Sequence, residues 1–364
     1  MSDTQVLPTA VNPVARPARR SVWRTAYFGT PGNALVTLIC GAVILLVAKL
    51  AFGWLFLDAV FDGGADACRQ SSGACWPFLA DKLRYMLFGF YPFEEQWRPL
   101  VALCLFLGAC SVSMVPRVWG RGLLLAWALV ILPGLYVLMA GGIFGLTAVP
   151  TSKWGGLPLS FMLSFVGLAF ALPLGIGLAL ARASHLPAIR VLGIGFIELV
   201  RGVPLISILF MAAVMLPLFM PDGVTIDKLL RAQVAIILFA AAYIAEIVRG
   251  GLQDVPSGQF EAGRALGLHY WQVMFKIILP QALKKVIPAL VSLFIAFFQD
   301  TTLVTIIGLL DFLDTVRTAL RDPDWQGIAV LEGYVFAAAV YFLFSALMGA
   351  YSRFLERHFN TSYR

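Results

Sequence analysis

A few charged and hydroxyl side chains lie inside stretches of the chain that are otherwise apolar. Glu198, Arg201 and Pro204 lie in one such stretch, and Asp300 and Thr302 lie in another. Burying a charge among apolar groups is costly, so such residues usually have a functional or structural partner. An arginine can bind a carboxylate, and an aspartate can accept hydrogen bonds from an ammonium group. These five residues are therefore candidates for binding a molecule that carries both charges.

A structural role is the alternative for such residues. Glu198 and Arg201 are three positions apart, as are Glu246 and Arg249, and this spacing makes residues neighbours on one helix face. Ion pairs of this kind could fix helix packing beside a helix break at Gly202–Pro204. We favour the structural role for Glu246 and Arg249, at the end of their stretch, whereas both roles stay open for the deeper residues.

The composition is that of a polytopic membrane protein. Of 364 residues, 60% are hydrophobic and 13% are charged, with a mean hydropathy of +0.85. About eight apolar stretches are long enough to cross a membrane as helices, which predicts an all-α membrane protein. They are 33–57, 99–115, 122–146, 156–181, 191–220, 232–248, 286–309 and 333–351. The polar, proline- and arginine-rich beginning of the sequence predicts no cleavable signal peptide.

The distribution of lysine and arginine predicts the orientation of these helices. If the N-terminus is cytoplasmic, the cytoplasmic side carries Arg16, Arg19, Arg20, Arg24, Arg117, Arg121, Arg182, Arg190, Arg249, Arg264, Lys276, Lys284, Lys285, Arg353, Arg357 and Arg364. The opposite side carries fewer, namely Arg69, Lys82, Arg84, Arg98, Lys153, Lys228, Arg231, Arg317 and Arg321. Both termini are therefore predicted to be cytoplasmic. The net charge of +7 then reflects topology, and we expect no binding of nucleic acid.

The segment from Gln253 to Pro280 separates two of these stretches and is too polar to lie in lipid. Ser257 can N-cap a short helix that carries Glu261 in its first turn. Gly267 can end this helix in the left-handed conformation. A second helix is then predicted from Tyr270 to Leu279, ending before the proline. The predicted unit is a helix, a glycine elbow and another helix.

The first helix of this unit has a small apolar face that suits docking to a partner. The face consists of Ala262, Ala265 and Leu266, three and four residues apart. The spacing of Glu261-Ala262-Gly263, then Gly267, then Ile277-x-Leu279-Pro280, resembles the Glu-Ala-Ala loop that couples ABC importer permeases to their ATPase. The alternative is an ordinary cytoplasmic helical hairpin. The resemblance implies that the coupling residues are Glu261, Ala262, Gly263, Ala265, Leu266, Gly267 and Leu268, where Gly263 replaces a usual alanine and leaves room for close docking.

Two further motifs resemble the amino-acid branch of these permeases. They are Glu198-Leu-Val-Arg201-Gly202-Val-Pro204 and Tyr243-Ile-Ala-Glu246-Ile-Val-Arg249-Gly250-Gly251. The resemblance covers the chain from Trp154 onward and implies a type I permease core of five helices over residues 151–364, with a cytoplasmic coupling loop at 250–284. Before it we place a cytoplasmic tail (1–30) and an accessory region (31–150) with three helices and a large periplasmic loop (58–97).

The resemblance implies a permease subunit of an importer for L-amino acids in the bacterial inner membrane, similar to the general L-amino acid systems of Gram-negative bacteria. Its implied partners are two ABC ATPase subunits, a homologous second permease and a periplasmic amino-acid-binding protein. The sequence has no Gly-x4-Gly-Lys-Ser/Thr phosphate loop, so we expect no enzyme activity and no cofactor in this chain, with ATP and Mg²⁺ bound by the ATPase partners. The alternatives are a secondary transporter or channel without an ATPase and, less favoured, an integral-membrane enzyme.

Five cysteines occur, and two of them lie in the predicted periplasmic loop. Cys68 and Cys75 flank a Ser-Ser-Gly turn in a compartment that is oxidising, which predicts a disulfide. Cys40, Cys104 and Cys110 lie within predicted helices. All three histidines map to the cytoplasmic side, so we predict no metal site in the loop.

Overall fold

The structure is a computed structural model that describes residues 19–359, so Arg16 and Arg364 of the predicted cytoplasmic arginines lie outside the described residues. The chain divides into two compact units, Met1–Cys75 and Trp76–Arg364. We describe each unit by itself.

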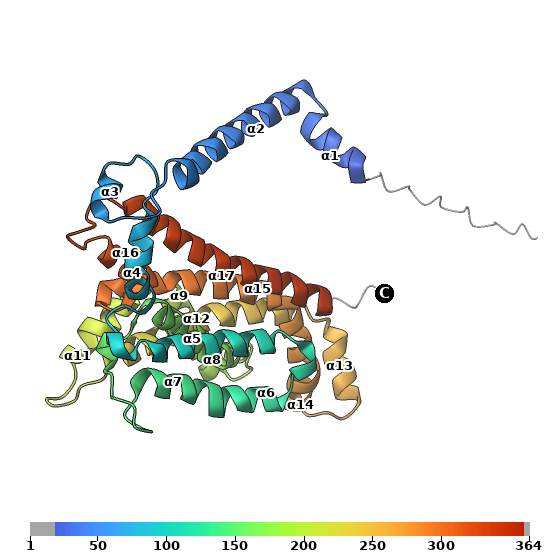
Figure 1. The fold of residues 1–364 in the computed structure, drawn as a ribbon. Coiled ribbons are helices and arrows are strands. Elements are labelled where there is room, and N and C mark those ends of the chain that lie inside the picture. Colours follow the sequence, from blue (N-terminus) through green and yellow to red (C-terminus); the bar gives the residue numbers. More distant parts are fainter. Residues whose placement is uncertain (1–18, 360–364) are drawn as a thin grey trace, which may run out of the picture. The chain divides into compact units, whose positions relative to one another are not determined.

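The first unit consists of a short helix, a long apolar helix and a loop. Helix α1 (Arg19–Phe28) leads into α2 (Pro31–Phe52), which continues as the π-helical turn η1 (Gly53–Leu57), and the loop contains α3 (Ala65–Arg69) (Figure 1). The side chain of Thr30 caps α2, and Pro31 occupies its first turn, where no backbone N–H is needed. Residues Pro31–Leu57 are long enough to span a membrane and contain an 18-residue window with a mean hydropathy of 2.6.

The second unit is helical throughout, apart from one two-residue strand. We call residues 253–280 the coupling segment, after their predicted role. The helices before it are α4 (Trp76–Phe88), η2 (Phe93–Glu95), α5 (Trp97–Ser113), η3 (Pro116–Val118), α6 (Arg121–Ala126), η4 (Trp127–Ile131), α7 (Leu132–Ala140), η5 (Thr151–Lys153), α8 (Gly156–Arg182), α9 (Pro187–Arg201), α10 (Leu205–Phe210), η6 (Met211–Met215), α11 (Leu216–Leu218) and α12 (Lys228–Gln253). The remaining elements are α13 (Ser257–Ala265), α14 (Tyr270–Val273), η7 (Met274–Ile278), α15 (Leu279–Asp300), η8 (Thr301–Ile307), β1 (Leu310–Asp311), α16 (Phe312–Ala319) and α17 (Val330–Phe359).

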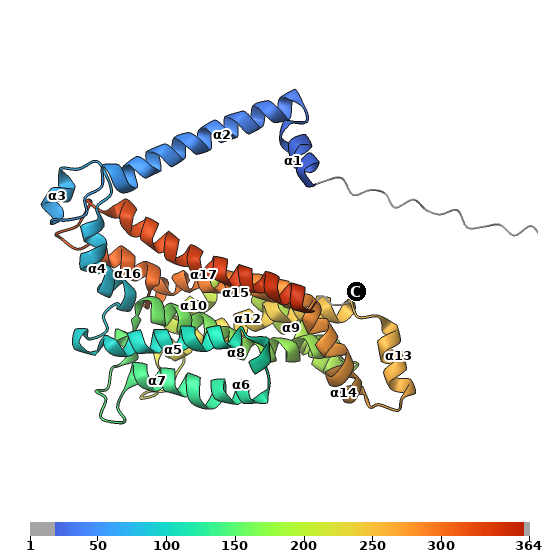
Figure 2. The ribbon, with the colours of Figure 1, turned by 45° about the vertical axis from the view of Figure 1, so that its right-hand side comes forward.

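The number of membrane helices agrees with the prediction. Among the described residues, seven helices are long and apolar enough to span a membrane, and an eighth span results if the bent pair of α9 with α10–α11 is counted as one. In the second unit, Figures 1 and 2 show α13 and α14 at one end, whereas α4, α16 and the end of α7 lie at the other. The all-α membrane fold is therefore confirmed.

Helices α8 and α12 form the centre of the second unit. Small residues allow the two helices to approach closely: a Cβ atom added at Gly175 of α8 would lie 2.6 Å from Cγ2 of Ile244 on α12. On α12, Ala240, Ala241 and Ala242 are fully buried. This close pair is the frame on which the other helices of the unit, including α9 and α15, are packed.

The fifth predicted stretch, 191–220, is not one straight helix. Helix α9 ends at Arg201, and α10 begins at Leu205, with an angle of 100° across the break. Pro204 has no N–H to continue the first helix, and its carbonyl instead accepts a hydrogen bond from Ser207 N in the next one. The Gly202–Pro204 step is thus a true break, and it brings the end of α9 and the start of α10 to one place.

Candidate functional site

The break between α9 and α10 forms one wall of a cavity of about 490 Å³. Arg201 and Pro204 line it at the break, and Asp300 lines it from the end of α15. The other walls are mainly apolar and include Phe239, Tyr243, Leu293, Phe297 and Leu303. The structure therefore brings Arg201 and Asp300 to a single cavity, whereas Glu198 and Thr302 are not among its lining residues.

Arg201 is held only loosely by the protein. Its Nη1 lies 3.5 Å from Oε2 of Glu246, and its guanidinium lies 5.5 Å from the centre of the Tyr243 ring. The side chain is 35% exposed. A guanidinium with a long ion pair and a free face can turn toward a ligand without breaking a tight contact.

Glu198 does not pair with Arg201, as the structural alternative for these two residues would require. Glu198 instead lies 2.9 Å from Arg182, at the end of α8. The reason is that α9 ends at Arg201, so the side chain of Arg201 reaches α12, while Glu198 one turn earlier faces α8. Sequence spacing identifies neighbours within a helix but does not show which neighbouring helix offers a closer partner.

Glu246 on α12 is the centre of a charge network at the ends of three helices. Its carboxylate lies 2.7 Å from Arg182, 3.0 Å from Arg249 and 3.5 Å from Arg201, and its side chain is only 16% exposed. The Glu246–Arg249 pair is the one predicted from spacing. The pairs to Arg182 and Arg201 connect α8 and α9 to α12, and these positions are too far apart in sequence for spacing to predict.

Asp300 is half-buried at the end of α15. Within residues 19–359, no ion pair or hydrogen bond engages its carboxylate. Its neighbours behave differently, since Thr301 Oγ1 donates to Phe298 O and Gln299 Nε2 donates to Ser345 Oγ. Asp300 therefore has acceptor capacity left for a ligand in the cavity.

The coupling segment has the predicted helix, elbow and helix. Gly267 adopts φ +73° after α13, the left-handed conformation that favours glycine. Ala262, Ala265 and Leu266 are exposed on α13, and the side chain of Leu266 is 78% exposed. An exposed leucine on a polar helix is a surface suited to a partner.

Gly263 has a different role from the predicted one. It is buried against the following helix, where an added Cβ would lie 2.8 Å from Cγ2 of Val273. The missing side chain therefore lets α13 pack on its own hairpin and does not make room for a partner. Leu268, half-buried, continues this packing, and its N–H donates to Gly263 O.

Three details of the helix ends also differ from the prediction. Ser257 is the first residue of α13 and not its N-cap, which is Pro256, so Glu261 lies in the second turn. The second helix does not end before Pro280, because the π-helical turn η7 precedes α15 and the proline falls in the first turn of α15. A π-turn shifts the carbonyl pattern by one residue and so accommodates a proline ring.

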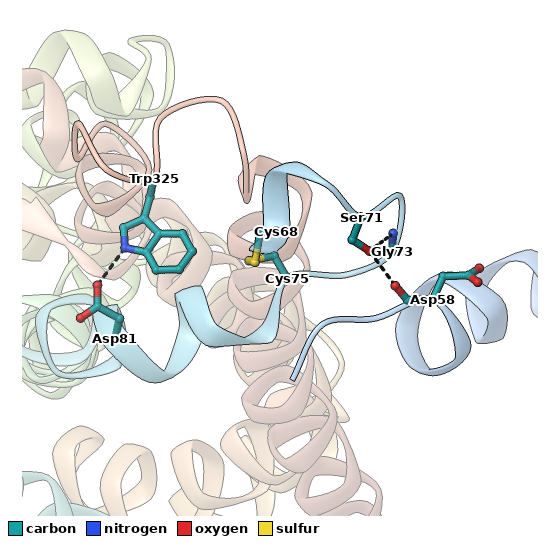
Figure 3. Close-up of a disulfide and its surroundings, with 7 residues drawn as sticks. All are labelled: Asp58, Cys68, Ser71, Gly73, Cys75, Asp81 and Trp325. Carbon is teal, nitrogen blue, oxygen red and sulfur yellow. Dashed lines mark hydrogen bonds between the residues drawn. A yellow bond between two sulfur atoms is a disulfide. The ribbon is translucent and has the colours of Figure 1, made fainter. Parts of the chain in front are cut away.

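The loop of the first unit, after the long apolar helix, contains the predicted pair of cysteines. Figure 3 shows a disulfide between Cys68 and Cys75, whose Cα atoms are 5.5 Å apart. Between them, Ser71 Oγ donates to Asp58 O and accepts from Gly73 N, so the turn is tied back to the end of the apolar helix. No group of three or more histidine, cysteine or acidic residues in the described part of the chain could hold a metal ion.

In the second unit, the rest of this predicted loop is a helix fixed to the core. Trp325 Nε1 donates to Asp81 of α4 (Figure 3), and Lys82 lies 2.8 Å from Asp322. The hydrogen bond from Lys82 lowers the pKa of Asp322, and the bond to Asp322 raises the pKa of Lys82. Asp322 and Trp325 both belong to the connection between α16 and α17, so α4 is an integral part of the second unit.

Asp311 is a fully buried carboxylate that the sequence analysis did not single out. It accepts hydrogen bonds from the N–H groups of Leu313 and Asp314, and thus caps α16, and also from the hydroxyl of Tyr341. Burial raises the pKa of Asp311 to about 6, although these hydrogen bonds act against the shift. The sequence signal is an Asp directly before a helix, which predicts a cap but not its burial.

Comparison with known proteins identifies the class of this chain. Residues 171–361 match the family described as binding-protein-dependent transport system inner membrane component. The chain belongs to this family. The permease is 46% identical to the inner membrane amino-acid ABC transporter permease protein YhdY of Escherichia coli K12, over 94% of each chain. It is 34% identical to the glutamate/glutamine/aspartate/asparagine transport system permease protein BztC of Rhodobacter capsulatus, over 100% of each chain.

A solved structure supports the same assignment. The permease is similar to the crystal structure of an amino acid ABC transporter with histidines, at 29% identity and a TM-score of 0.50, over 56% of this chain and 92% of the other. The permease is therefore the transmembrane subunit of an amino-acid ABC importer and not an enzyme, as the motifs indicated. Nothing in these comparisons supports the alternative of a secondary transporter or channel.

Proposed function

We propose that the cavity at the α9–α10 break is the intramembrane amino-acid site of this importer. The observation that carries the proposal is that Arg201 and Asp300, from different helices, line one cavity and both have binding capacity left. The guanidinium of Arg201 would bind the substrate carboxylate, and Asp300 would accept from its ammonium group. Leu205, the first residue of α10, also lines the cavity, so backbone groups at the helix end could assist.

The walls of the cavity favour a broad range of side chains. Phe239, Tyr243 and Phe297 offer apolar and aromatic surface without a second fixed charge. Arg201 and Asp300 would recognise the zwitterionic end that all L-amino acids share, and such a surface would discriminate weakly among their side chains. The several substrates in the name of the Rhodobacter relative are consistent with this range.

The coupling segment and the family support a proposal for the partners. The exposed face of Ala262, Ala265 and Leu266 would dock on one of two ATPase subunits, which would bind ATP and Mg²⁺. A second, homologous permease would complete the path, and a periplasmic binding protein would deliver the amino acid. This arrangement places α13 and both chain termini in the cytoplasm and the disulfide loop in the periplasm.

The domain organisation is also part of the proposal. We propose that residues 151–364 form the translocating domain, that 31–150 form an accessory region specific to the longer permeases, and that 1–30 form a cytoplasmic tail. The whole-length match to two long relatives, against 56% coverage by the solved transporter, supports an added region.

Transport by the reconstituted complex tests the site. Arg201→Ala and Asp300→Asn should each reduce amino-acid uptake by at least about tenfold, the effect expected when a charged binding partner is lost. Assembly and basal ATPase activity should persist, because Glu246 keeps its two closer arginines when Arg201 is removed. Glu198→Gln is the matched control, since Glu198 lies outside the cavity wall.

Two results would contradict this proposal in different ways. Loss of assembly in Arg201→Ala would show that the residue serves packing. Unchanged uptake in both cavity variants, with the complex intact, would show that the substrate passes elsewhere.

A further inference from the structure

A second cavity, unrelated to the proposed amino-acid site, lies between the hairpin formed by α5 to α7 and the core helix α8. Its volume is about 280 Å³. Residues from all three sides are apolar, among them Ala102 on α5, Ala128 and Met139 on η4 and α7, and Met162 and Phe165 on α8. Apolar cavities of roughly 150 Å³ already bind molecules the size of benzene, so this one has room for a longer hydrocarbon segment.

The walls of the cavity are rigid. The ring of Phe165 packs against those of Phe106 and Trp127, with centres 5.0 and 4.7 Å apart. The π-helical turn η4 and Pro133 interrupt the regular helix of α6 and α7 at the cavity, which widens the helix locally. The cavity is therefore formed by the backbone and by interlocked rings, and it does not depend on one movable side chain.

A hydrogen-bond network fixes the hairpin at one end of the cavity. The fully buried Arg98 donates to Leu138 O and Thr147 O, and the hydroxyl of Tyr91 donates to Met139 O. These bonds join Arg98 at the start of α5, and Tyr91 just before it, to the end of α7 and to the loop that follows it. Because the carbonyls at the end of α7 are satisfied in this way, the hairpin is held in place and the cavity persists.

The depth of the cavity in the membrane follows from where its residues lie on each helix. Most of them lie in the first half of α5, the last half of the α6–α7 span and the first half of α8, and Phe106, Ala128 and Phe170 extend the cavity to the middle of these helices. All three positions are at the end of the unit opposite α13 and α14 (Figure 1). The cavity therefore lies within the hydrocarbon layer, in the leaflet away from the coupling segment.

We propose that this cavity binds one acyl chain of a membrane phospholipid from that leaflet. Its lining is apolar except for Tyr136, and one hydroxyl supplies fewer than the two to four polar partners that a buried water needs, whereas hydrocarbon chains are the surrounding solvent at this depth. A bound chain would fill the space between the accessory hairpin and the core, and so would act as part of their packing. The ligand class is a glycerophospholipid, recognised through its tail.

Photolabelling in lipid nanodiscs tests the proposal on the intact importer complex. The probe is a phosphatidylethanolamine with a diazirine in the middle of one acyl chain. Peptide mapping should place adducts on Met162 and Phe165 at a higher yield than on Leu129, which is 69% exposed on the outer face of the same hairpin. If the probe is diluted with unlabelled lipid before illumination, labelling at the cavity should also persist longer than labelling at Leu129.

Filling the cavity provides the second arm of the test. Ala102→Phe and Ala128→Phe each add a ring inside the cavity and should lower labelling of Met162 by about tenfold, since burial of several methylene groups is lost. Leu129→Phe adds similar bulk on the outer face and should leave labelling of Met162 unchanged. Equal labelling inside and outside in the wild-type protein, or unchanged labelling in a folded filled variant, would overturn the proposal. So would capture of residues 31–57 or of the second permease by a photoreactive residue at position 162.

Discussion

The coupling segment and the charge network around Glu246 differ in how far apart their contacting residues lie in the sequence. In the segment, the helix α13, the elbow at Gly267 and the packing of Gly263 on Val273 all involve residues within about ten positions. In the network, Glu246 contacts Arg182 and Arg201, 64 and 45 positions earlier (246 − 182 and 246 − 201). Sequence spacing therefore predicts the helix, elbow and helix of the first region, whereas in the second it finds the Glu246–Arg249 pair and misses the pairs to Arg182 and Arg201.

The difference also separates the consequences of mutation. A change in the coupling segment alters the surface that we propose docks on a partner and leaves the membrane helices untouched. A change in the network alters contacts among α8, α9 and α12, so it affects the stability of the permease itself. In the first case we expect transport to be lost while the stability of the permease is kept. In the second case we expect the stability itself to fall.

The largest effect is expected from Gly267→Val. A β-branched residue at φ +73° is strained by roughly 1 to 2 kcal/mol, which displaces the elbow. The variant should insert and fold normally but lose most substrate-stimulated ATP hydrolysis and transport in proteoliposomes. Gly267→Asn is the control, because asparagine tolerates the left-handed conformation and no atom lies within 4 Å of an added Cβ. Wild-type transport by the valine variant would show that this loop does not couple.

A companion change probes the docking face directly. Ala262→Asp places a charge on the exposed face of α13 without altering the elbow. We expect loss of ATPase association, measured by copurification, because a buried unpaired charge at the contact is unfavourable. Glu261→Ala should be milder, and equal copurification by the aspartate variant would remove this face from the interface.

The next effect concerns the network. Glu246→Gln leaves the three arginines Arg182, Arg201 and Arg249 around a neutral side chain and should lower the free energy of unfolding by about 3 kcal/mol. Glu198→Gln should cost less than about 1 kcal/mol, since Glu198 is 56% exposed and has one partner. Thermal unfolding in detergent compares the two variants. Equal melting temperatures of the two variants would mean that Glu246 contributes no more to stability than Glu198 does.

The disulfide is a local contact like those of the coupling segment. Closing the short loop between Cys68 and Cys75 should stabilise the first unit by on the order of 2 to 3 kcal/mol. Peptide mass mapping without reduction should show the two linked, while Cys40, Cys104 and Cys110 are available to alkylation after unfolding. Alkylation of both Cys68 and Cys75 under these conditions would contradict the pairing.

Much of the fold could be predicted because membrane helices are long, apolar and separated by polar segments. The break at Gly202–Pro204 was also visible, since proline and glycine act locally. The cavity could be predicted only as a pair of candidate residues, because its shape depends on how α9, α12 and α15 pack. The partner of Glu198 and the burial of Asp311 depend on contacts far apart in the sequence, so spacing could not predict them. The contact of Gly263 with Val273 is local, but it depends on how α13 folds back on α14 and not on spacing within one helix.

The smallest expected effect tests one of these long-range contacts through pH. The pKa of Asp311 is about 6 in the folded protein, because burial raises it, against roughly 3.9 for an exposed aspartate. At a pH between these two values, Asp311 therefore keeps its proton in the folded protein but has lost it in the unfolded chain. The contribution of this proton to the free energy of unfolding is fully present below about pH 4 and is lost as the pH rises through 6. Groups facing Asp311 are the N–H groups of Leu313 and Asp314, the hydroxyl of Tyr341 and the carboxylate of Asp314.

Asp311→Asn isolates this contribution because asparagine is neutral throughout and keeps one acceptor oxygen for the cap of α16. The melting temperature of the variant minus that of the wild-type protein should fall when the pH is lowered from 7.5 to 5, since only the wild-type side chain gains a proton. Asp324→Asn, at an exposed position in the connection before α17, controls for general changes in charge. A difference that stays constant with pH would mean that Asp311 titrates like an exposed aspartate, and that its contacts with Leu313 N and Tyr341 do not hold it in a buried site.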